Sequence, residues 1–233
     1  MSGIREKHRI TQSLKTVDLQ SSITELLKLP ASQVINPLFA GLCSSDERIR
    51  WHAITVMGAV VSSLAKKDME AARVVMRRLM WSLNDESGGI GWGAPEAMAE
   101  IMACHDSLAA EYSHILVSYM REDGNFLELV SLQRGLLWGV GRLAQVKPDL
   151  LHASDAVRYL MPYLDSEDAA VLGLTAWTLG LLNAGEALGS LQSLTENDRE
   201  VRLFINRRLE ILSVGVLAEQ AVTAISKNEQ PVL

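Results

Sequence analysis

The chain has 233 residues, with 22 Lys and Arg against 28 Asp and Glu, and its formal net charge is −6. Hydrophobic residues make up 48% of it and charged residues 21%, which are ordinary proportions for a globular protein and exclude a wholly disordered chain. Residues 1–116 carry 12 basic and 13 acidic groups, and residues 117–233 carry 10 and 15. Because neither part has the excess of Lys and Arg that nucleic-acid binding requires, the charge argues against a nucleic-acid partner.

Both ends of the chain are polar. We expect a mobile segment over residues 1–16, without a signal peptide, and a mobile tail over residues 226–233. The longest nearly unbroken apolar run, residues 171–182, is shorter than the roughly 20 residues that cross a bilayer. We therefore expect a cytoplasmic protein with no membrane partner, in which Cys43 and Cys104 are free thiols within the core.

Between these ends the chain repeats itself, after an amphipathic helix predicted over residues 17–29 and closed by Pro30. Three segments share a Leu, an Asp four residues later, a β-branched residue three further on and an apolar residue eight beyond that. They are Leu42-Asp46-Ile49-Met57, Leu164-Asp168-Val171-Leu179 and Leu194-Asp198-Val201-Leu209. Two weaker copies fill residues 73–100 and 115–141. Equivalent residues are separated by 42, 41, 39 and 30 positions, which is the length of a helix-pair repeat, at Gly58, Glu100, Gly141, Gly180 and Glu210.

One repeat reads as two helices joined by a short polar loop. The first helix ends near the Leu, and the Asp of the loop can cap the second helix by accepting hydrogen bonds from its first backbone N–H groups. Apolar residues follow at helical spacing along the second helix, and a helix that begins after residue 211 closes the array. Small residues such as Gly58, Gly141 and Gly180 would let neighbouring helices approach closely, and stacked pairs bury what one pair cannot.

The pattern Leu-x3-Asp-x2-(Ile/Val)-Arg, with its arginine at Arg50 and Arg202, resembles the HEAT repeat over roughly residues 33–218. The resemblance is to the short type found in phycobilisome-lyase-like proteins, and the glycine-rich stretch 88–96 is similar to one in small bacterial HEAT-like proteins of unassigned activity. It implies an all-α fold, a right-handed α-α superhelix (α-solenoid) of about five helix pairs with terminal capping helices. A single domain would then cover residues 17–225.

The second helices of such a solenoid line its concave face. If the repeat register holds, the outward positions of these helices place Trp51, Trp138 and Trp177 near Arg134, Arg142 and Arg207. Trp and Arg are the residue types that dominate binding hot spots, so these six residues are candidate contacts for a protein partner of unknown identity. The alternative is that the tryptophans fill gaps between neighbouring repeats.

A glycine-rich loop is the most unusual feature of the sequence. Its glycines are Gly88, Gly89, Gly91 and Gly93, followed by Pro95 in the position typical of a first helical turn. A phosphate-binding loop would continue with Lys-Ser/Thr, and a dinucleotide-binding loop would follow a strand, and neither is present. The loop is either a turn that needs positive φ angles or a partner-contacting loop anchored by Trp92.

Acidic pairs recur in the loops within the repeats, as at Glu122-Asp123 and at residues 165–168. Helix capping and solubility explain most of them, although a ridge of such loops could also attract a basic partner. The histidines have no spacing that aims two ligands at one metal ion, and the His-Glu dipeptides of HEAT-like hydroxylases are missing. We therefore expect no metal and no other cofactor.

These features favour a non-catalytic scaffold that binds a partner protein through its concave face and glycine-rich loop. One alternative is a HEAT-like enzyme such as a DNA glycosylase, with Glu96 or Glu100 as the acid, which the acidic charge disfavours. Another is a phycobilisome-lyase-like, chromophore-handling protein, which rests on analogy alone.

Overall fold

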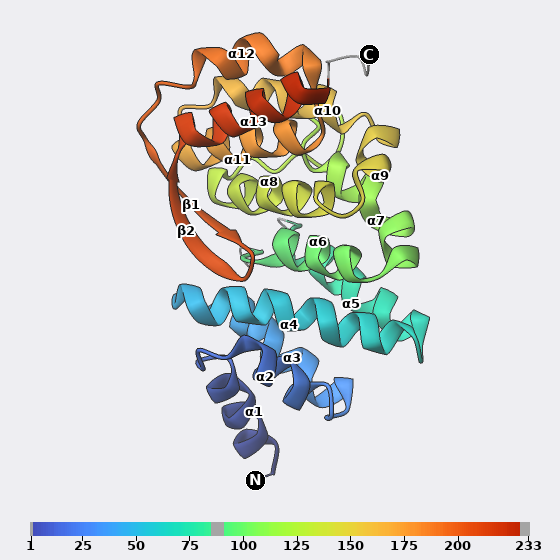
Figure 1. Cartoon of the computed structure of the whole chain (residues 1–233). Helices are drawn as coiled ribbons and strands as arrows, with labels where there is room; N and C mark the ends of the chain where they lie inside the picture. The colour runs from blue at the N-terminus through green and yellow to red at the C-terminus, as the bar shows by residue number, and fades with distance from the viewer. Residues whose placement is uncertain (1, 85–90, 229–233) are drawn as a thin grey trace. The chain divides into compact units, whose positions relative to one another are not determined.

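The computed structural model describes residues 2–84 and 91–228 of the chain (Figure 1). Contacts divide the chain into two compact units, Met1–Tyr112 and Ser113–Leu233, where the sequence predicts one domain over residues 17–225. In a stack of repeats, each repeat contacts mainly its neighbours, so a single solenoid can divide into separate groups of contacts. The two units are described separately.

Unit 1 consists of helices, and its second helices α4 and α6 pack along each other. Helix α3 pairs with α4, and α5 pairs with α6. The helix expected over residues 17–29 is α2. The elements are α1 (Ser2–Ser13), α2 (Leu19–Leu26), α3 (Ala31–Leu42), α4 (Glu47–Ala65), α5 (Met69–Ser82), α6 (Ala94–Cys104) and α7 (Asp106–Ser118), which continues into unit 2.

Helix α1 lies within residues 1–16, the segment that the sequence predicts to be mobile. Ile10 and Leu14 are fully buried, and the carbonyl oxygen of Leu14 lies 2.8 Å from Nδ1 of His52 in α4. Two apolar residues four positions apart fall on one side of a helix and give this polar segment a face to bury. The overall polarity of the segment concealed that face.

Unit 2 is built around three second helices, α8, α11 and α13, which lie side by side (Figure 1). The first helices of its last two pairs are broken into short pieces. The elements are α8 (Val130–Ala144), α9 (Pro148–Ala153), α10 (Ala156–Leu160), the 3-10 turn η2 (Met161–Asp165), α11 (Ala169–Leu181), η3 (Gly185–Ala187), α12 (Leu188–Ser193), β1 (Glu200–Ile205), β2 (Arg208–Ser213) and α13 (Val214–Asn228).

Two of the repeated aspartates cap helices as predicted. The Asp46 carboxylate accepts hydrogen bonds from the backbone N–H groups of Arg48 and Ile49 at the start of α4. Asp168 accepts the corresponding bonds from Ala170 and Val171 at the start of α11. The shared Asp of the repeat therefore begins the second helix in both copies.

The fifth repeat departs from the prediction, because the stretch expected to form its second helix is an antiparallel hairpin of β1 and β2. Asn206 and Arg207 form the two-residue turn at φ 50° and 63°, the region that tight hairpin turns require. Val201, Phe204 and Ile205 are residues that favour strands. Helix α13 is the second helix of this pair, as the contact of Gly180 with Ala221 shows. The residue equivalent to Gly180 in the fifth repeat is therefore Ala221, 41 positions later, and not Glu210, 30 positions later.

Glycines mark the points where successive second helices touch. A Cβ atom on Gly58 of α4 would lie 2.7 Å from Cγ of Glu100 in α6. A Cβ on Gly180 of α11 would lie 2.6 Å from Cα of Ala221 in α13, and one on Gly141 of α8 would overlap the ring of Trp177 in α11. The repeating small residue therefore sets the close approach of the helices, as the sequence predicts.

We expect Gly141→Ala to lower the free energy of unfolding by about 3 kcal/mol, because the added methyl group overlaps a ring that is itself packed in the core. Urea denaturation measures this change. Gly189→Ala in α12 is the matched control, since nothing lies within 4 Å of its Cβ position and alanine favours the helix. Equal stability of Gly141→Ala and the wild type would show that this helix contact is not tight.

Candidate functional site

The three tryptophans expected on the inner face are buried. Trp51 is 8% exposed, Trp138 4% and Trp177 8%. The Trp177 ring occupies the space above Gly141, between α8 and α11. For Trp177 the structure therefore matches the alternative in which an indole fills the gap between two repeats.

The hairpin covers Trp138, which the sequence places on the outward side of α8. The Trp138 indole N–H donates a 2.7 Å hydrogen bond to the Phe204 carbonyl oxygen, and the two ring centroids lie 6.5 Å apart. Val201 of the same strand packs over Gly173 of α11. Strand β1 thus lies on the second helices of unit 2, and no repeat pattern could have indicated this.

The three candidate arginines occupy different environments. The Arg134 guanidinium donates two hydrogen bonds to the Asp168 carboxylate, one of them from Nε at 3.0 Å. Partial burial acts to raise the pKa of Asp168, but the bonds from Arg134 and from the backbone of α11 outweigh it and the pKa is lowered. Arg142 is half-buried, with Nη1 at 3.5 Å from Oε1 of Gln145. Arg207 lies in the hairpin turn and not on a second helix.

The described part of the glycine-rich loop returns onto the end of α5; Gly88 and Gly89 lie outside the described residues. Gly93 precedes α6 at φ 71°, which matches the expected need for positive φ. A Cβ on Gly91 would lie 2.6 Å from the carbonyl oxygen of Ser82, so there the chain runs directly against α5.

Two exposed tryptophans flank this contact. Trp92 is 43% exposed and Trp81, next to Ser82, is 62% exposed. We call these two residues the tryptophan patch. Trp92 is a candidate from the sequence, whereas the sequence analysis does not single out Trp81. The sequence signal that could have identified Trp81 is a tryptophan near the end of a predicted helix that is followed by a glycine-rich stretch.

Glu96, in the first turn of α6, is a buried carboxyl group. Burial raises its pKa from the usual 4.5 to about 7, although its backbone N–H and the nearby Arg50 act in the opposite direction. Its Oε2 atom has no hydrogen-bond partner among the described residues. A carboxyl group in this setting is protonated in the folded chain at mildly acidic pH.

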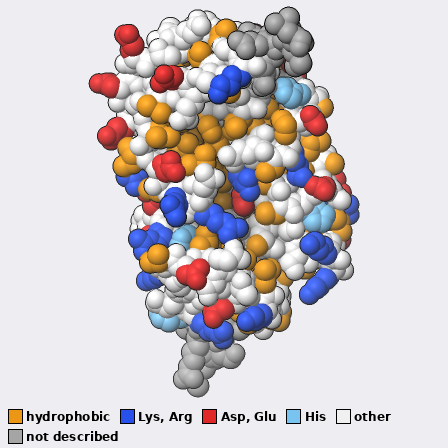
Figure 2. All heavy atoms as spheres, viewed as in Figure 1, with side chains coloured by type: hydrophobic (Ala, Val, Ile, Leu, Met, Phe, Trp, Pro, Cys, Tyr) orange, Lys and Arg blue, Asp and Glu red, His pale blue; other side chains and the backbone are white. Residues whose placement is uncertain are grey.

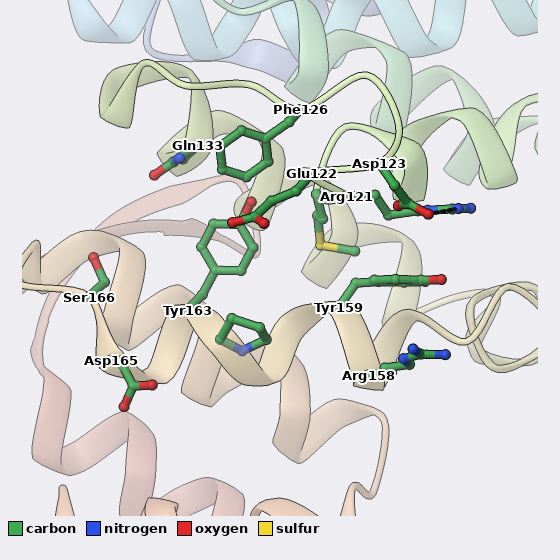
Figure 3. Close-up of a pocket in the computed structure, with 12 residues that line it drawn as sticks. Arg121, Glu122, Asp123, Phe126, Gln133, Arg158, Tyr159, Tyr163, Asp165 and Ser166 are labelled. Atoms are coloured by element: carbon green, nitrogen blue, oxygen red, sulfur yellow. Dashed lines mark hydrogen bonds and ion pairs between the residues drawn. The ribbon is translucent and has the colours of Figure 1, made fainter.

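Unit 2 also contains a pocket of about 600 Å³ that the sequence does not reveal (Figure 3). It lies between the loop after α7 and the α10–η2 segment. Its lining mixes aromatic rings with both kinds of charge: Met120, Arg121, Glu122, Asp123, Phe126, Gln133, Arg158, Tyr159, Pro162, Tyr163, Asp165 and Ser166. The acidic pair Glu122-Asp123, read from sequence as a capping and solubility feature, forms part of this wall.

Within residues 2–84 and 91–228, no three His, Cys, Asp or Glu side chains converge as metal ligands would. None of the helices described there combines the length and hydropathy of a membrane-spanning segment. Cys43 and Cys104 form no disulfide and are exposed, where the sequence predicts core thiols. Both lie at the ends of helices, α3 and α6, where an apolar helical pattern reaches the surface.

Comparison with known proteins supports the architecture. The HEAT-like repeat family model matches residues 130–182, which run from α8 to α11. An engineered protein from a structural genomics consortium superposes with a TM-score of 0.54 at 17% identity, covering 95% of this chain and 96% of its own. No curated protein matches the sequence.

Two designed armadillo repeat proteins are similar as well. YIII(Dq)4CqI gives a TM-score of 0.51 at 18% identity, and YIII(Dq.V1)4CPAF, solved in complex with the peptide (KR)4, gives 0.53 at 18%. Each alignment covers 93% of this chain and 98% of the designed one. The fold is an all-α solenoid of the HEAT and armadillo type, with one added strand pair.

We expect Trp138→Ala to lower the free energy of unfolding by about 3–5 kcal/mol, because it removes a buried indole and its hydrogen bond to the hairpin. Arg134→Ala breaks a partly exposed ion pair and should cost about 1 kcal/mol or less. Urea denaturation followed by circular dichroism compares the two. If Trp138→Ala unfolds at the same urea concentration as the wild type, the hairpin does not cover the ring in solution.

We expect the contribution of Glu96 to the free energy of unfolding to fall as the pH rises through the interval from 4.5 to 7, while the lowered pKa of buried His52 acts in the opposite direction. In that interval folded Glu96 holds a proton that the unfolded chain has released, and each pH unit changes the free energy of unfolding by up to about 1.4 kcal/mol. Glu96→Gln should therefore be as stable as the wild type near pH 4.5 and more stable at pH 8. Glu25→Gln, at an exposed position of α2, is the control. If the difference in free energy of unfolding between Glu96→Gln and the wild type were the same at pH 4.5 and at pH 8, the raised pKa of Glu96 would be contradicted.

Proposed function

We propose that this chain is a non-catalytic, cytoplasmic interaction scaffold that binds a partner protein through the tryptophan patch of unit 1. The observation that supports the proposal is the exposure of Trp81 and Trp92 at adjoining points of the chain. Tryptophan is among the residues most enriched in binding hot spots, because a large, rigid ring buries much area at a small entropic cost. The glycine-rich loop between the two indoles would contribute backbone contacts to the same partner.

The outer face of α5 supplies a rim for this patch. Val74, 44% exposed, lies two helical turns before Trp81 and therefore on the same side of α5. Arg78, between them, stacks over the Phe39 ring at 4.2 Å and donates a 3.0 Å hydrogen bond to Asn36. These contacts hold the arginine in place, so a partner would meet a charged group that is already ordered.

The second-helix face of unit 2 is a further candidate contact. Figure 2 shows apolar side chains gathered in part of the surface, and Val130 of α8 and Val216 of α13 are exposed apolar residues of these helices, at 45% and 39%. The hairpin covers Trp138 on this face, Trp177 fills the gap between α8 and α11, and Arg134 and Arg142 lie on α8. A designed armadillo repeat protein of similar fold is solved in complex with the peptide (KR)4, which is consistent with a peptide segment as the partner here.

No observation favours the enzymatic alternatives to the same degree. A HEAT-like DNA glycosylase would need accessible aromatic rings beside an acid, and Trp51, Trp138 and Trp177 are buried. A chromophore-handling role, as in phycobilisome lyases, continues to rest on the sequence resemblance alone.

We expect affinity purification from the native host to capture a partner protein with the wild-type chain and to lose it at least tenfold with the double variant Trp81→Ala/Trp92→Ala. Both rings are substantially exposed, so the variant should fold, which circular dichroism checks. Val17→Ala, which truncates an 88% exposed apolar residue of the same unit, is the matched control. Equal capture by the double variant and the control would refute the tryptophan patch as the binding surface.

A further inference from the structure

The pocket of unit 2 has two chemically different ends (Figure 3). At one end Arg121 is paired in bidentate fashion with Asp123, through Nε–Oδ1 and Nη2–Oδ2 distances of 3.0 and 2.9 Å. The guanidinium carbons of Arg121 and Arg158 lie 5.1 and 5.7 Å from the centre of the Tyr159 ring. Arg158 also lies 3.8 Å from Asp155. The charges at this end are therefore matched within the chain.

The other end has acceptor groups that the described residues do not use. Tyr163 is 7% exposed, yet its hydroxyl oxygen has no hydrogen-bond partner among these residues. Figure 3 shows Phe126 and the Glu122 carboxylate beside the ring of Tyr163, on the pocket side of η2. A buried hydroxyl without a partner costs about 1–3 kcal/mol, and this oxygen is closed to solvent, so a ligand donor reaches it once the surrounding side chains move.

The composition of this end selects a cation. Glu122 supplies a carboxylate, Tyr163 a hydroxyl oxygen, and Phe126 an aromatic ring whose face attracts positive charge. Burial and the neighbouring Glu122 raise the pKa of Tyr163 to about 12, so the hydroxyl stays neutral. A guanidinium group can donate to the carboxylate and to the hydroxyl at once, because its five N–H groups form a rigid planar fork.

We propose that this pocket holds an arginine side chain of the partner protein, with the guanidinium group between Glu122 and Tyr163 and its aliphatic stem against Phe126. This inference rests on the proposed function in one respect, namely that the partner is a protein. A volume of about 600 Å³ lies within the range of small-ligand sites and exceeds the size of one side chain, so flanking residues of the partner segment would enter as well.

The test is an NMR titration of the full chain with the peptide Ac-Ala-Ala-Arg-Ala-Ala-NH2. We expect saturable shifts of the backbone amide signals of residues 121–126 and 158–166. The same peptide with citrulline in place of arginine, which keeps the shape and removes the charge, should bind at least tenfold more weakly. Equal shifts with both peptides, or none with the arginine peptide at 10 mM, would overturn the proposal.

Two variants assign the contacts. Glu122→Gln should weaken binding at least fivefold, whereas Glu167→Gln, the same change of charge at an exposed position outside the pocket, should leave it within twofold. Tyr163→Phe removes one oxygen atom that has no partner in the described chain, so the protein should fold as before and bind about threefold more weakly. Equal effects of the two glutamate variants would mean that the peptide senses overall charge and not this pocket.

This titration is independent of the capture experiment. Its signals come from unit 2, and the capture experiment depends on Trp81 and Trp92 of unit 1. If the arginine peptide does not bind but the wild-type chain captures a partner protein through Trp81 and Trp92, the arginine pocket alone is refuted. Peptide binding without an effect of the tryptophan substitutions would refute the tryptophan patch alone.

Discussion

The close approach of neighbouring second helices is the constraint on which the rest of this structure depends. It requires a residue without a side chain at Gly58 against Glu100, at Gly141 against Trp177 and at Gly180 against Ala221. A hydrogen bond often accompanies the contact, as from the Ser62 hydroxyl to the carbonyl oxygen of Cys104. Dense packing of this kind leaves little room for a larger side chain, so small residues recur wherever helices meet.

The same packing determines where a binding surface can lie. In an idealised solenoid, the indoles on the second helices would face a groove. Here Trp177 instead fills the space over Gly141, and Trp138 lies under strand β1. The exposed anchors lie instead where the repeat is interrupted. Trp81 and Trp92 flank the glycine-rich loop of unit 1, and the pocket of Tyr163 lies where the first helix of the fourth pair breaks into α10 and η2. Irregular segments on a rigid scaffold are common positions for binding residues.

Sequence reasoning recovered the features that depend on local chemistry. The aspartates that begin α4 and α11 and the small residues along the second helices follow from capping and from helical periodicity. It failed at residues 200–213. A pattern of Leu, Asp and Val there resembles the repeat, but the residues form two strands joined by an Asn-Arg turn. Among the candidate site residues, Trp92 is 43% exposed, whereas Arg207 lies in a turn and not on a helix.

The sequence alone determined the fold class, the repeat length and the helix starts, because these depend on the periodicity of apolar residues and on capping within a few positions of the chain. Tertiary structure decided which indoles are buried and which are exposed, that β1 covers Trp138, and that Glu122, Phe126 and Tyr163 share one pocket. These outcomes depend on contacts between residues about 40 or more positions apart. No local pattern encodes them, because each depends on how neighbouring helices and loops fill the same space.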